Sequence, residues 1–542
     1  MESILREQKI SARRDRLKAM MSTSEGIYDR MLSRVKGQGE AKEKIGMAAL
    51  MWVSHSERPL KVDELCHALA IKIGSTDLDP ENVPSINALL NCCQGLLLVD
   101  NEASTVRLIH STLQEYLSTC PDLFDRAHSK IAETCLTYLN FNRFKGLPAS
   151  DLSDPTPTPF LGYSSVHWGA HAKKELSDCA KSLALKLFGD YDYHASVKLL
   201  LKHVSNPDRF DDKDFPSFTG LHCASFFGIV EVVAALVEMR DCDVNQKDCV
   251  GNTPLIWATK NGHQGVVELL LGRGDVIPEK PDNRGQTPLI WAAEGGYGGL
   301  VELLLRRDDV YPGRADFDGR TPLLMAAQNG NKEVVKLLLC RDDVNPDKPD
   351  PEGQTPLSWA ARNGHERVVE LLLCRDDVNP DKPDTEGQTP LSWAARSGHE
   401  GVVRQLLYQE DVNPNRPDTE GQTPLSWAAR SSHEGVVRQL LYRENINPNR
   451  PDTVSQTPLP RAARRCYEGG VKQLLYRDDT SPHNPDTEGQ TPLSGVAEAG
   501  HEGTLNIPRK RKDVTPDTPG RSSHTSSTPC TTSRKRAKPA VR

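Results

Sequence analysis

The sequence predicts a mainly α-helical protein, in which a solenoid of short helical repeats follows a non-repeating helical region. The tripeptide Thr-Pro-Leu occurs eight times at a constant spacing of 34 residues. Residues 386–408 and 420–442 differ at a single position. The 38 prolines and 39 glycines indicate many short elements joined by turns. A segment copied nearly letter for letter is not a unique active site.

Each repeat contains two predicted helices, as the copy at residues 389–407 illustrates. Thr389 is suited to cap the first helix, and Pro390 fits the first helical position, where no N–H group is needed. A pair of alanines then allows neighbouring units to approach closely, and a Gly-His step ends the helix. The apolar spacing in VVRQLL predicts a second, antiparallel helix. The Pro-, Asn- and Asp-rich segment after it predicts a hairpin loop.

The pattern TPL…AA…G…VV…LL, at this period, resembles the ankyrin repeat. The resemblance implies a helix–helix–hairpin unit and an array that binds a protein or peptide partner on its concave face. The His that usually follows Thr-Pro-Leu is Ile, Leu or Ser in these units, so a common intra-repeat hydrogen-bonding side chain is lost. The next position is Trp in five units, where we expect core stacking between units and not a binding surface: Trp257, Trp291, Trp359, Trp393 and Trp427.

The positions after the small-residue pair are expected to face outward, and arginines there predict a basic stripe for an acidic peptide. Glutamates of the hairpins offer an alternative, because they would form salt bridges with those arginines. The candidate partner-binding residues are Lys260, Glu294, Gln328, Arg362, Arg396 and Arg430 on the first helices, and Glu352, Glu386 and Glu420 in the hairpins. The histidines of the Gly-His step are expected to be structural, because their 34-residue spacing keeps them too far apart to share a metal ion.

The two ends of the array differ from its middle. The divergent first unit, residues 218–248, is expected to dock on the region before it, because a terminal repeat must cover its apolar face. Pro460 enters the first helix of a late unit, and Pro508 interrupts the second helix of the last one. We therefore expect stability to fall toward residue 500.

The region before the repeats has the outline of a winged helix. Residues 43–56, 58–71 and 85–95 are predicted helices, and a hairpin is predicted at residues 96–110. The third helix contains no Lys or Arg, so nucleic acid is not an expected partner. The expected organisation is a helical leader at 1–42, a winged-helix-like domain at 43–120, a helical bundle at 121–207, about eight to nine ankyrin units of 34 residues at 208–508, and a basic tail at 509–542.

The runs YDRMLSRV at 28–35, GLLLVD at 95–100 and VRLIHSTLQEYL at 106–117 resemble the segment after the NACHT ATPase module of fungal NOD-like STAND proteins. That resemblance implies that His110 contacts the phosphate of a bound nucleotide. The chain has no Gly-Lys dipeptide, which the phosphate-binding loop of such an ATPase requires. We therefore expect no cofactor here and a packing or capping role for His110. The resemblance leaves open a natural short form or a gene model that lost the ATPase module.

The basic tail contrasts with an acidic body. Residues 509–542 carry a net charge of +8, whereas the whole chain carries −7. Two basic clusters in the tail resemble nuclear-import signals, and a merely solubilising tail is the alternative. The nuclear-import candidates are Arg509, Lys510, Arg511, Lys512, Arg534, Lys535, Arg536 and Lys538.

The sequence lacks several common catalytic and metal-binding motifs. The 13 cysteines include no C-x-x-C pair and no zinc-ligand spacing, and neither G-x-S-x-G nor H-E-x-x-H occurs. No apolar run is long enough to span a bilayer. We therefore expect a non-enzymatic interaction protein without metal or cofactor. Its expected location is the cytoplasm, with nuclear entry if the basic clusters act as import signals.

Overall fold

The computed structural model describes residues 26–144, 158–189, 194–204, 217–239, 242–464 and 468–481, together with residues 485, 489 and 491. The chain forms two compact units, Met1–Asn345 and Pro346–Arg542. Helices dominate both units. Within the described residues, no helix combines the length and apolar character that crossing a membrane requires.

The first unit begins with a helix over residues 26–36 and a winged-helix domain. Its elements are α3 (Glu40–His55), β1 (Leu60–Lys61), α4 (Val62–Ala70), η1 (Pro80–Asn82), α5 (Ile86–Cys92), β2 (Leu97–Asp100), β3 (Thr105–Leu108), α6 (Ser111–Thr119) and η2 (Pro121–Leu123). The three predicted helices and the predicted hairpin are confirmed. The helix predicted at residues 58–71 begins only at Val62, because Leu60–Lys61 form strand β1 and complete an antiparallel sheet in the order β1-β3-β2. Val106 is buried at the centre of this sheet, between Leu60 and Val99.

A helical bundle follows in the same unit. It comprises α7 (Ala127–Leu139), η3 (Asn142–Phe144), α8 (Leu161–Lys174), α9 (Asp178–Phe188) and α10 (Ala195–Val204). Helix α7 packs against α8 and α9, and α10 packs against α8. Aromatic rings fill the core, with Tyr138 lying 5.0 Å from Phe144 and 5.3 Å from Phe160 between ring centroids.

Paired helices then repeat along the chain. In the first unit they are α11 (Gly220–Phe227) with α12 (Val230–Val237), α13 (Pro254–Lys260) with α14 (Gln264–Leu271), α15 (Pro288–Gly295) with α16 (Gly298–Leu305), and α17 (Pro322–Asn329) with α18 (Lys332–Leu339). In the second unit they are α19 (Pro356–Asn363) with α20 (Glu366–Leu373), α21 (Pro390–Ser397) with α22 (Glu400–Leu407), α23 (Pro424–Ser431) with α24 (Glu434–Leu441), and α25 (Pro458–Arg464) with α26 (Glu468–Tyr476).

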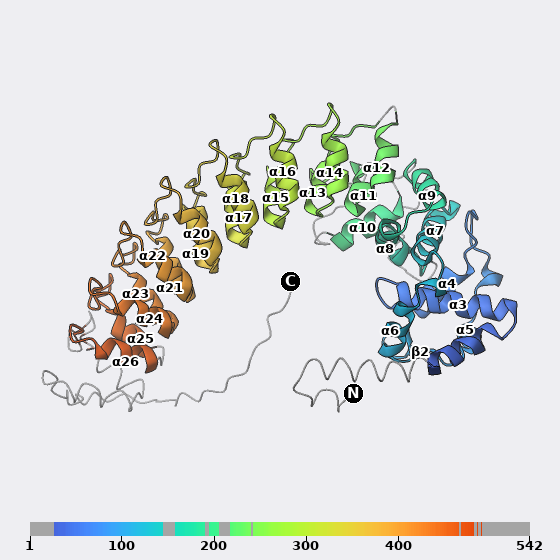
Figure 1. Cartoon of the computed structure of the whole chain (residues 1–542), viewed down its shortest axis with the longest axis horizontal. Helices are drawn as coiled ribbons and strands as arrows, with labels where there is room; N and C mark the ends of the chain where they lie inside the picture. Colours follow the sequence, from blue (N-terminus) through green and yellow to red (C-terminus); the bar gives the residue numbers. More distant parts are fainter. Residues whose placement is uncertain are drawn as a thin grey trace. The chain divides into compact units, whose positions relative to one another are not determined.

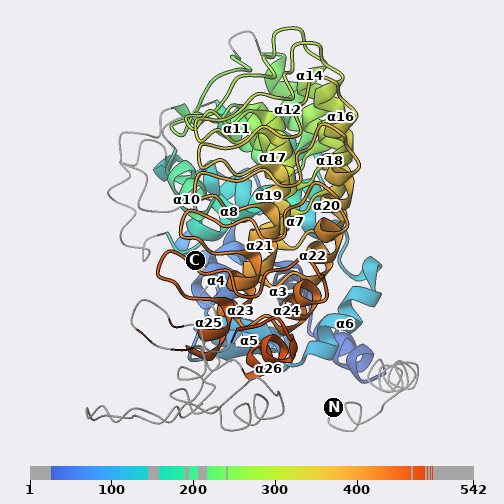
Figure 2. The ribbon, with the colours of Figure 1, turned by 90° about the vertical axis from the view of Figure 1, so that its left-hand side faces the viewer.

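The repeats of the second unit form two layers. Helices α19, α21, α23 and α25 pack in succession, while α20, α22, α24 and α26 form the other layer (Figures 1 and 2). The local chemistry is as predicted. Thr389 Oγ1 accepts a hydrogen bond from the backbone N–H of Ser392 at 3.2 Å, and Pro390 occupies the first turn. The hydroxyl groups of Thr389 and Ser392 also lie 3.2 Å apart, so Ser replaces part of the hydrogen bonding of the usual His.

A left-handed residue caps helices α11, α15, α17, α19, α21 and α23 at the glycine step, and after α13 the left-handed Gly262 follows one residue later. Gly398 has φ 85°, a conformation that glycine adopts without steric cost. In the next copy, Ser432 adopts the same conformation with φ 64°. The single difference between the two copies therefore places a side chain where glycine is preferred.

The first repeat docks on the helical bundle, as predicted for a terminal unit. Helix α11 contacts α8 and α9, and α12 contacts α9. Gly169 of α8 lies directly against Phe227 of α11, because a Cβ atom at Gly169 would come within 2.1 Å of the Phe227 ring. The ring centroid of Phe227 also lies 5.1 Å from that of Trp168. The bundle thus covers the apolar face of the first repeat.

Candidate partner-binding face

The predicted partner-contact residues occupy equivalent places at the ends of the first helices. In the second unit, Arg362, Arg396 and Arg430 lie on α19, α21 and α23, which pack side by side. Arg396 is exposed, whereas Lys260, Glu294, Gln328, Arg362 and Arg430 are half-buried. The predicted outward orientation is therefore only partly correct, and the contacts described below explain why.

An aspartate nine residues earlier anchors the tryptophan in four of the repeats. The Nε1–H of Trp393 donates a hydrogen bond to Oδ2 of Asp384. Oδ1 of Asp384 accepts from the backbone N–H groups of Glu386 and Gln388, so one carboxylate fixes both the hairpin and the indole. The equivalent pairs are Trp257 with Asp248, Trp359 with Asp350, and Trp427 with Asp418. Where Arg461 replaces the tryptophan, its guanidinium donates to Asp452.

The predicted core role of the tryptophans is confirmed, but their faces also contact cations. Trp257, Trp393 and Trp427 are buried, and Trp291 and Trp359 are half-buried. The guanidinium carbon of Arg396 lies 5.3 Å from the ring centroid of Trp393 and 4.3 Å from that of Trp427. Each distance falls within the range of cation–π attraction.

The same alternation extends on both sides of Arg396. Arg362 lies 5.0 Å from the ring centroid of Trp359 and 4.4 Å from that of Trp393. Arg430 lies 5.2 Å from Trp427. Contact with the indole rings accounts for the partial burial of Arg362 and Arg430, whereas Arg396 stays exposed although it contacts two indoles. We call this series the Arg–Trp column; its members are Trp359, Arg362, Trp393, Arg396, Trp427 and Arg430.

The guanidinium groups of the column have few acceptors within the protein. Nη1 of Arg362 lies 3.5 Å from Oε1 of Gln354, and Nη1 of Arg396 lies 3.5 Å from Oε1 of Gln388. Across the described residues, the three guanidinium groups show no further hydrogen bond. Because each guanidinium has five N–H donors, most of these donors remain available to a partner.

The predicted alternative, salt bridges to the hairpin glutamates, is not found in the described part of the chain. Glu352, Glu386 and Glu420 are exposed at the hairpins. The carboxylate of Glu386 accepts a hydrogen bond from Gln388 Nε2 at 3.3 Å, and that of Glu420 accepts one from Gln422 Nε2 at 2.8 Å. The carboxylates of Glu386 and Glu420 thus bond to neighbouring glutamines and, among the described residues, form no salt bridge with the arginines of the Arg–Trp column.

His263, His399 and His433 connect successive repeats, which confirms the structural role predicted for these histidines, whereas His501 lies outside the described residues. Nε2 of His399 lies 3.0 Å from the backbone oxygen of Arg362, and Nε2 of His433 lies 3.0 Å from that of Arg396. A carbonyl oxygen only accepts, so the imidazole N–H donates in both bonds. Each of these two histidines therefore holds the main chain of the arginine in the preceding repeat.

A related arrangement occurs in the first unit. Nζ of Lys260 lies 5.5 Å from the ring centroid of Trp257 and 4.1 Å from that of Trp291. Burial lowers the pKa of Lys260 from its ordinary value, and the nearby carboxylate of Glu294 opposes this shift. Burial likewise raises the pKa of Glu294, while Lys260 opposes that change. The charge of each residue therefore partly opposes the effect of burial on the pKa of the other. This part of the face carries mixed charge.

The sequence reasoning missed the aspartates that anchor the tryptophans. The signal was present, because Asp precedes Trp by nine residues in these units. Recognising it required knowledge of the hairpin conformation that brings the two side chains together.

His110 has the capping role predicted from the sequence. Its side chain is exposed, and Nδ1 accepts a hydrogen bond from the backbone N–H of Thr112 at the start of α6. It lies at a cavity of about 370 Å³ whose lining includes Glu57, Arg58 and Gln114.

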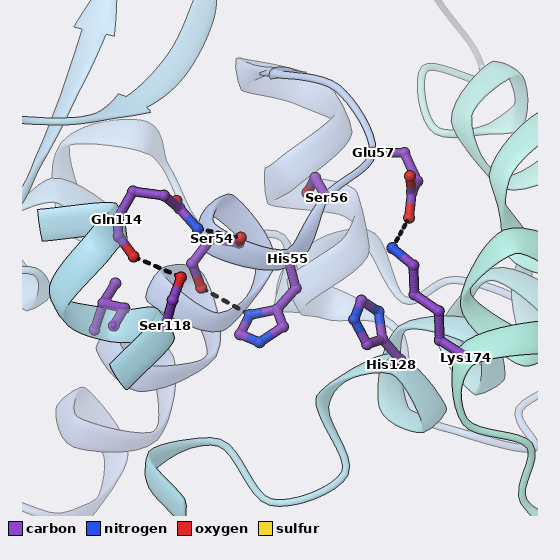
Figure 3. A pocket seen from close by; sticks show the side chains of 9 residues that line it. Ser54, His55, Ser56, Glu57, Gln114, Ser118, His128 and Lys174 are labelled. Atoms are coloured by element: carbon purple, nitrogen blue, oxygen red, sulfur yellow. Dashed lines mark hydrogen bonds and ion pairs between the residues drawn. The ribbon is translucent and has the colours of Figure 1, made fainter. Parts of the chain in front are cut away.

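A second polar pocket lies among α3, α6, α7 and α8 of the first unit (Figure 3). The pocket measures about 270 Å³, and its lining includes His55, His128, Gln114 and an ion pair of 2.6 Å between Lys174 and Glu57. His128 Nδ1 lies 2.8 Å from Nδ1 of the buried His171. Within the described residues, no group of three or more His, Cys, Asp or Glu side chains could hold a metal ion.

Burial lowers the pKa of the histidines around this pocket and so favours their neutral form. It lowers the pKa of His171 to about 3, and the neighbouring His128 and Lys174 lower it further. Burial also lowers the pKa of His55 and of His128. The Oη atom of Tyr163 lies 2.9 Å from Nε2 of His171, which suits a neutral ring whose Nε2 accepts a hydrogen bond from the phenol O–H. The positive charge at this pocket therefore comes from Lys174, which is paired with Glu57.

The tail positions lie outside the described residues, so the nuclear-import candidates remain a prediction.

Comparisons with known proteins agree with this architecture. The family described as ankyrin repeats (3 copies) matches at residues 221–316, 309–384 and 376–452. Residues 28–132 match the GPI inositol-deacylase, winged helix domain family. The human ankyrin repeat and SAM domain-containing protein 3 is 44% identical over 54 residues, which are 10% of this chain and 8% of that protein. The chain thus spans a small part of that relative. It contains ankyrin repeats over residues 221–452 and a winged-helix domain in its N-terminal region.

Proposed function

We propose that the protein is a non-enzymatic interaction scaffold whose ankyrin repeats hold a protein partner against the Arg–Trp column. The observation that carries this proposal is the series of guanidinium groups in register, whose donors are largely unoccupied. Arginine and tryptophan are the residues that most often dominate binding energy at protein interfaces.

Preorganisation makes this face suited to binding. The side chains of Arg362 and Arg396 each lie between two indole rings, and the indoles are themselves held by aspartates. An arginine that is already ordered loses less conformational entropy when a partner binds. The energy of each new hydrogen bond therefore contributes more fully to affinity.

Charge reversal in the full-length protein tests this function. The protein would carry a photo-reactive amino acid at position 397, beside the column, which cross-links to a bound partner. We expect the triple variant R362E/R396E/R430E to lose this cross-link. The matched control is R367E/R404E/R438E, which makes the same change in charge at exposed arginines of α20, α22 and α24. Equal capture by the wild-type protein and the first triple variant would contradict the proposal.

The winged-helix match supports a more specific biological context. We propose that the chain works as the sensor part of a NACHT-associated system of the fungal NOD-like receptor kind, in signalling or self/non-self recognition. Its support is the match at residues 28–132, adjacent to an ankyrin array.

A second candidate is a fragment or short form of a STAND NTPase whose nucleotide-binding module is not part of this chain. The cavity beside His110 favours this candidate, because the family likeness places a phosphate contact at that histidine. Chromatography of an acid extract of the purified protein tests whether this chain itself holds a nucleotide. We expect no nucleotide, whereas one ADP per chain would support the NTPase reading.

For location, we propose the cytoplasm, with nuclear entry through the basic tail. A fluorescent fusion of the full chain should enter the nucleus and should lose that ability when Arg534, Lys535, Arg536 and Lys538 become alanine. Wild-type fluorescence that stays in the cytoplasm would contradict the import proposal.

A further inference from the structure

We propose that the Arg–Trp column recognises a segment of the partner in the polyproline II conformation, with a carboxylate at every third residue. This inference rests on the proposed function, because it names the chemistry of the partner that the same face would bind. Three properties of the column lead to it: the orientation of the guanidinium donors, their spacing, and the charges beside them.

The indole rings determine where the guanidinium donors point. The guanidinium carbon of Arg396 lies over the rings of both Trp393 and Trp427, at 5.3 and 4.3 Å from their centroids. The N–H donors of a guanidinium lie in its plane. We infer that the guanidinium group stacks on these rings and keeps its donors along the exposed edge, which is the geometry that accepts a carboxylate through two parallel hydrogen bonds.

The spacing of the arginines follows from helix packing. Arg362, Arg396 and Arg430 occupy equivalent positions on three successively packed helices. Packed helices lie about 8–10 Å apart. A partner must therefore present one acceptor about every 8–10 Å, all on one side.

Polyproline II matches this requirement. It has three residues per turn and rises about 3.1 Å per residue, so every third side chain lies on one face at intervals of about 9 Å. In a β-strand, residues three apart point to opposite faces. An α-helix places residues seven apart at about 10.5 Å on one face, but its backbone carbonyls are already hydrogen-bonded. Polyproline II leaves its carbonyls free to accept the donors that a carboxylate does not use.

The charges beside the column favour an intermittently acidic peptide over a continuous polyanion. Glu386 and Glu420 are exposed in the hairpins, where they accept hydrogen bonds from Gln388 and Gln422. Gln388 in turn lies 3.5 Å from Arg396 of the column. A nucleic acid, with a phosphate at every nucleotide, would meet these carboxylates as well as the arginines. A peptide with uncharged residues between its glutamates avoids that repulsion.

Two peptides of identical composition test the spacing. We would measure fluorescence anisotropy of labelled Glu-Pro-Pro-Glu-Pro-Pro-Glu and Glu-Pro-Glu-Pro-Glu-Pro-Pro with the full-length protein at about 0.15 M salt, where general charge attraction is screened beyond about 8 Å. The first peptide should bind at least ten-fold more tightly. Arg396→Lys should weaken it several-fold although the charge is retained, because lysine offers no planar edge. Arg404→Lys on the other helix layer is the matched control and should leave binding unchanged.

Each other outcome overturns the inference in a recognisable way. Equal binding of the two peptides would show general attraction to acidic chains, which contradicts the spacing but leaves the proposed function intact. Tighter binding of a helical peptide with glutamates seven residues apart, or of a single-stranded oligonucleotide, would replace the polyproline II partner. Binding of neither peptide would overturn the inference. If R362E/R396E/R430E also retained partner capture, the proposed function would fail with it.

Discussion

The Nε1–H of Trp393 donates a hydrogen bond of 2.9 Å to Oδ2 of Asp384. Replacement of Trp393 by Phe should therefore destabilise the repeat by about 1–3 kcal/mol beyond the lost packing, because it leaves a buried carboxylate oxygen without its partner. The chain offers a matched control in Trp291, whose buried Nε1 has no hydrogen-bond partner among the described residues. Hydrogen exchange would report the stability of α21 in Trp393→Phe and of α15 in Trp291→Phe. The loss of protection should be smaller for Trp291→Phe. Equal losses would mean that the bond contributes nothing beyond packing.

Ser432 should be the least favourable turn residue of the near-identical copies, because it adopts φ 64°. A left-handed L-residue costs about 1–2 kcal/mol, and the extra chain entropy of glycine offsets about half of that. Ser432→Gly should raise the melting temperature of the second unit, with a gain of about 0.5–1 kcal/mol. The reciprocal Gly398→Ser should be more harmful, because its Cβ would lie 2.5 Å from Nδ1 of His433. A melting temperature that falls in Ser432→Gly would contradict this account of the turn.

A single added methyl group at Gly169 should destabilise the junction between the helical bundle and the first repeat. Gly169→Ala places a Cβ atom 2.1 Å from the Phe227 ring, and we expect a loss of about 1–3 kcal/mol from overpacking. Gly162 lies on the same helix with no atom within 4 Å of an added Cβ, so Gly162→Ala should be neutral or stabilising. Urea denaturation of the full chain compares the two. A second change, Phe227→Leu, should recover part of the stability lost in Gly169→Ala; failure to do so would place the effect elsewhere.

The first unit should lose stability as pH falls below about 6.5. Burial lowers the pKa of His171 to about 3, whereas an unfolded histidine has a pKa of about 6.5. Between these values the unfolded chain binds more protons, so the contribution of His171 is complete above about 6.5 and is lost as pH decreases. The expected slope is about 1.4 kcal/mol per pH unit for this group. Hydrogen exchange in α7 and α8 between pH 7.5 and 4.5 measures it, and His171→Gln should flatten the profile. An unchanged profile in that variant would assign the pH dependence to other groups.

Much of the fold could be predicted because its signals are local. Thr389 and Pro390 specify the start of a helix through their own chemistry, and thus the repeat could be divided into elements from sequence alone. Strand β1 escaped prediction because Leu60–Lys61 is too short to show alternation, and it exists only through pairing with β3.

The candidate face was only partly predictable. The positions of Arg362, Arg396 and Arg430 follow from the repeat, but their contact with the tryptophans depends on the next unit along the array. The bond from His399 to Arg362 has a backbone oxygen as acceptor, so no side-chain pattern could reveal it. Such contacts belong to the stacking of repeats, which the sequence predicted in general but not atom by atom.

The bond between each histidine and the carbonyl 37 residues before it has an evolutionary consequence. The acceptor is a backbone atom that every repeat supplies. The junction created by the duplication or deletion of a repeat can therefore form the same hydrogen bond as the original junctions. Loss of residues 386–419, for example, would bring His433 to the place of His399 against Arg362. The gene can therefore lengthen or shorten the array by recombination between copies, and each such event would add or remove one arginine without requiring a compensating mutation.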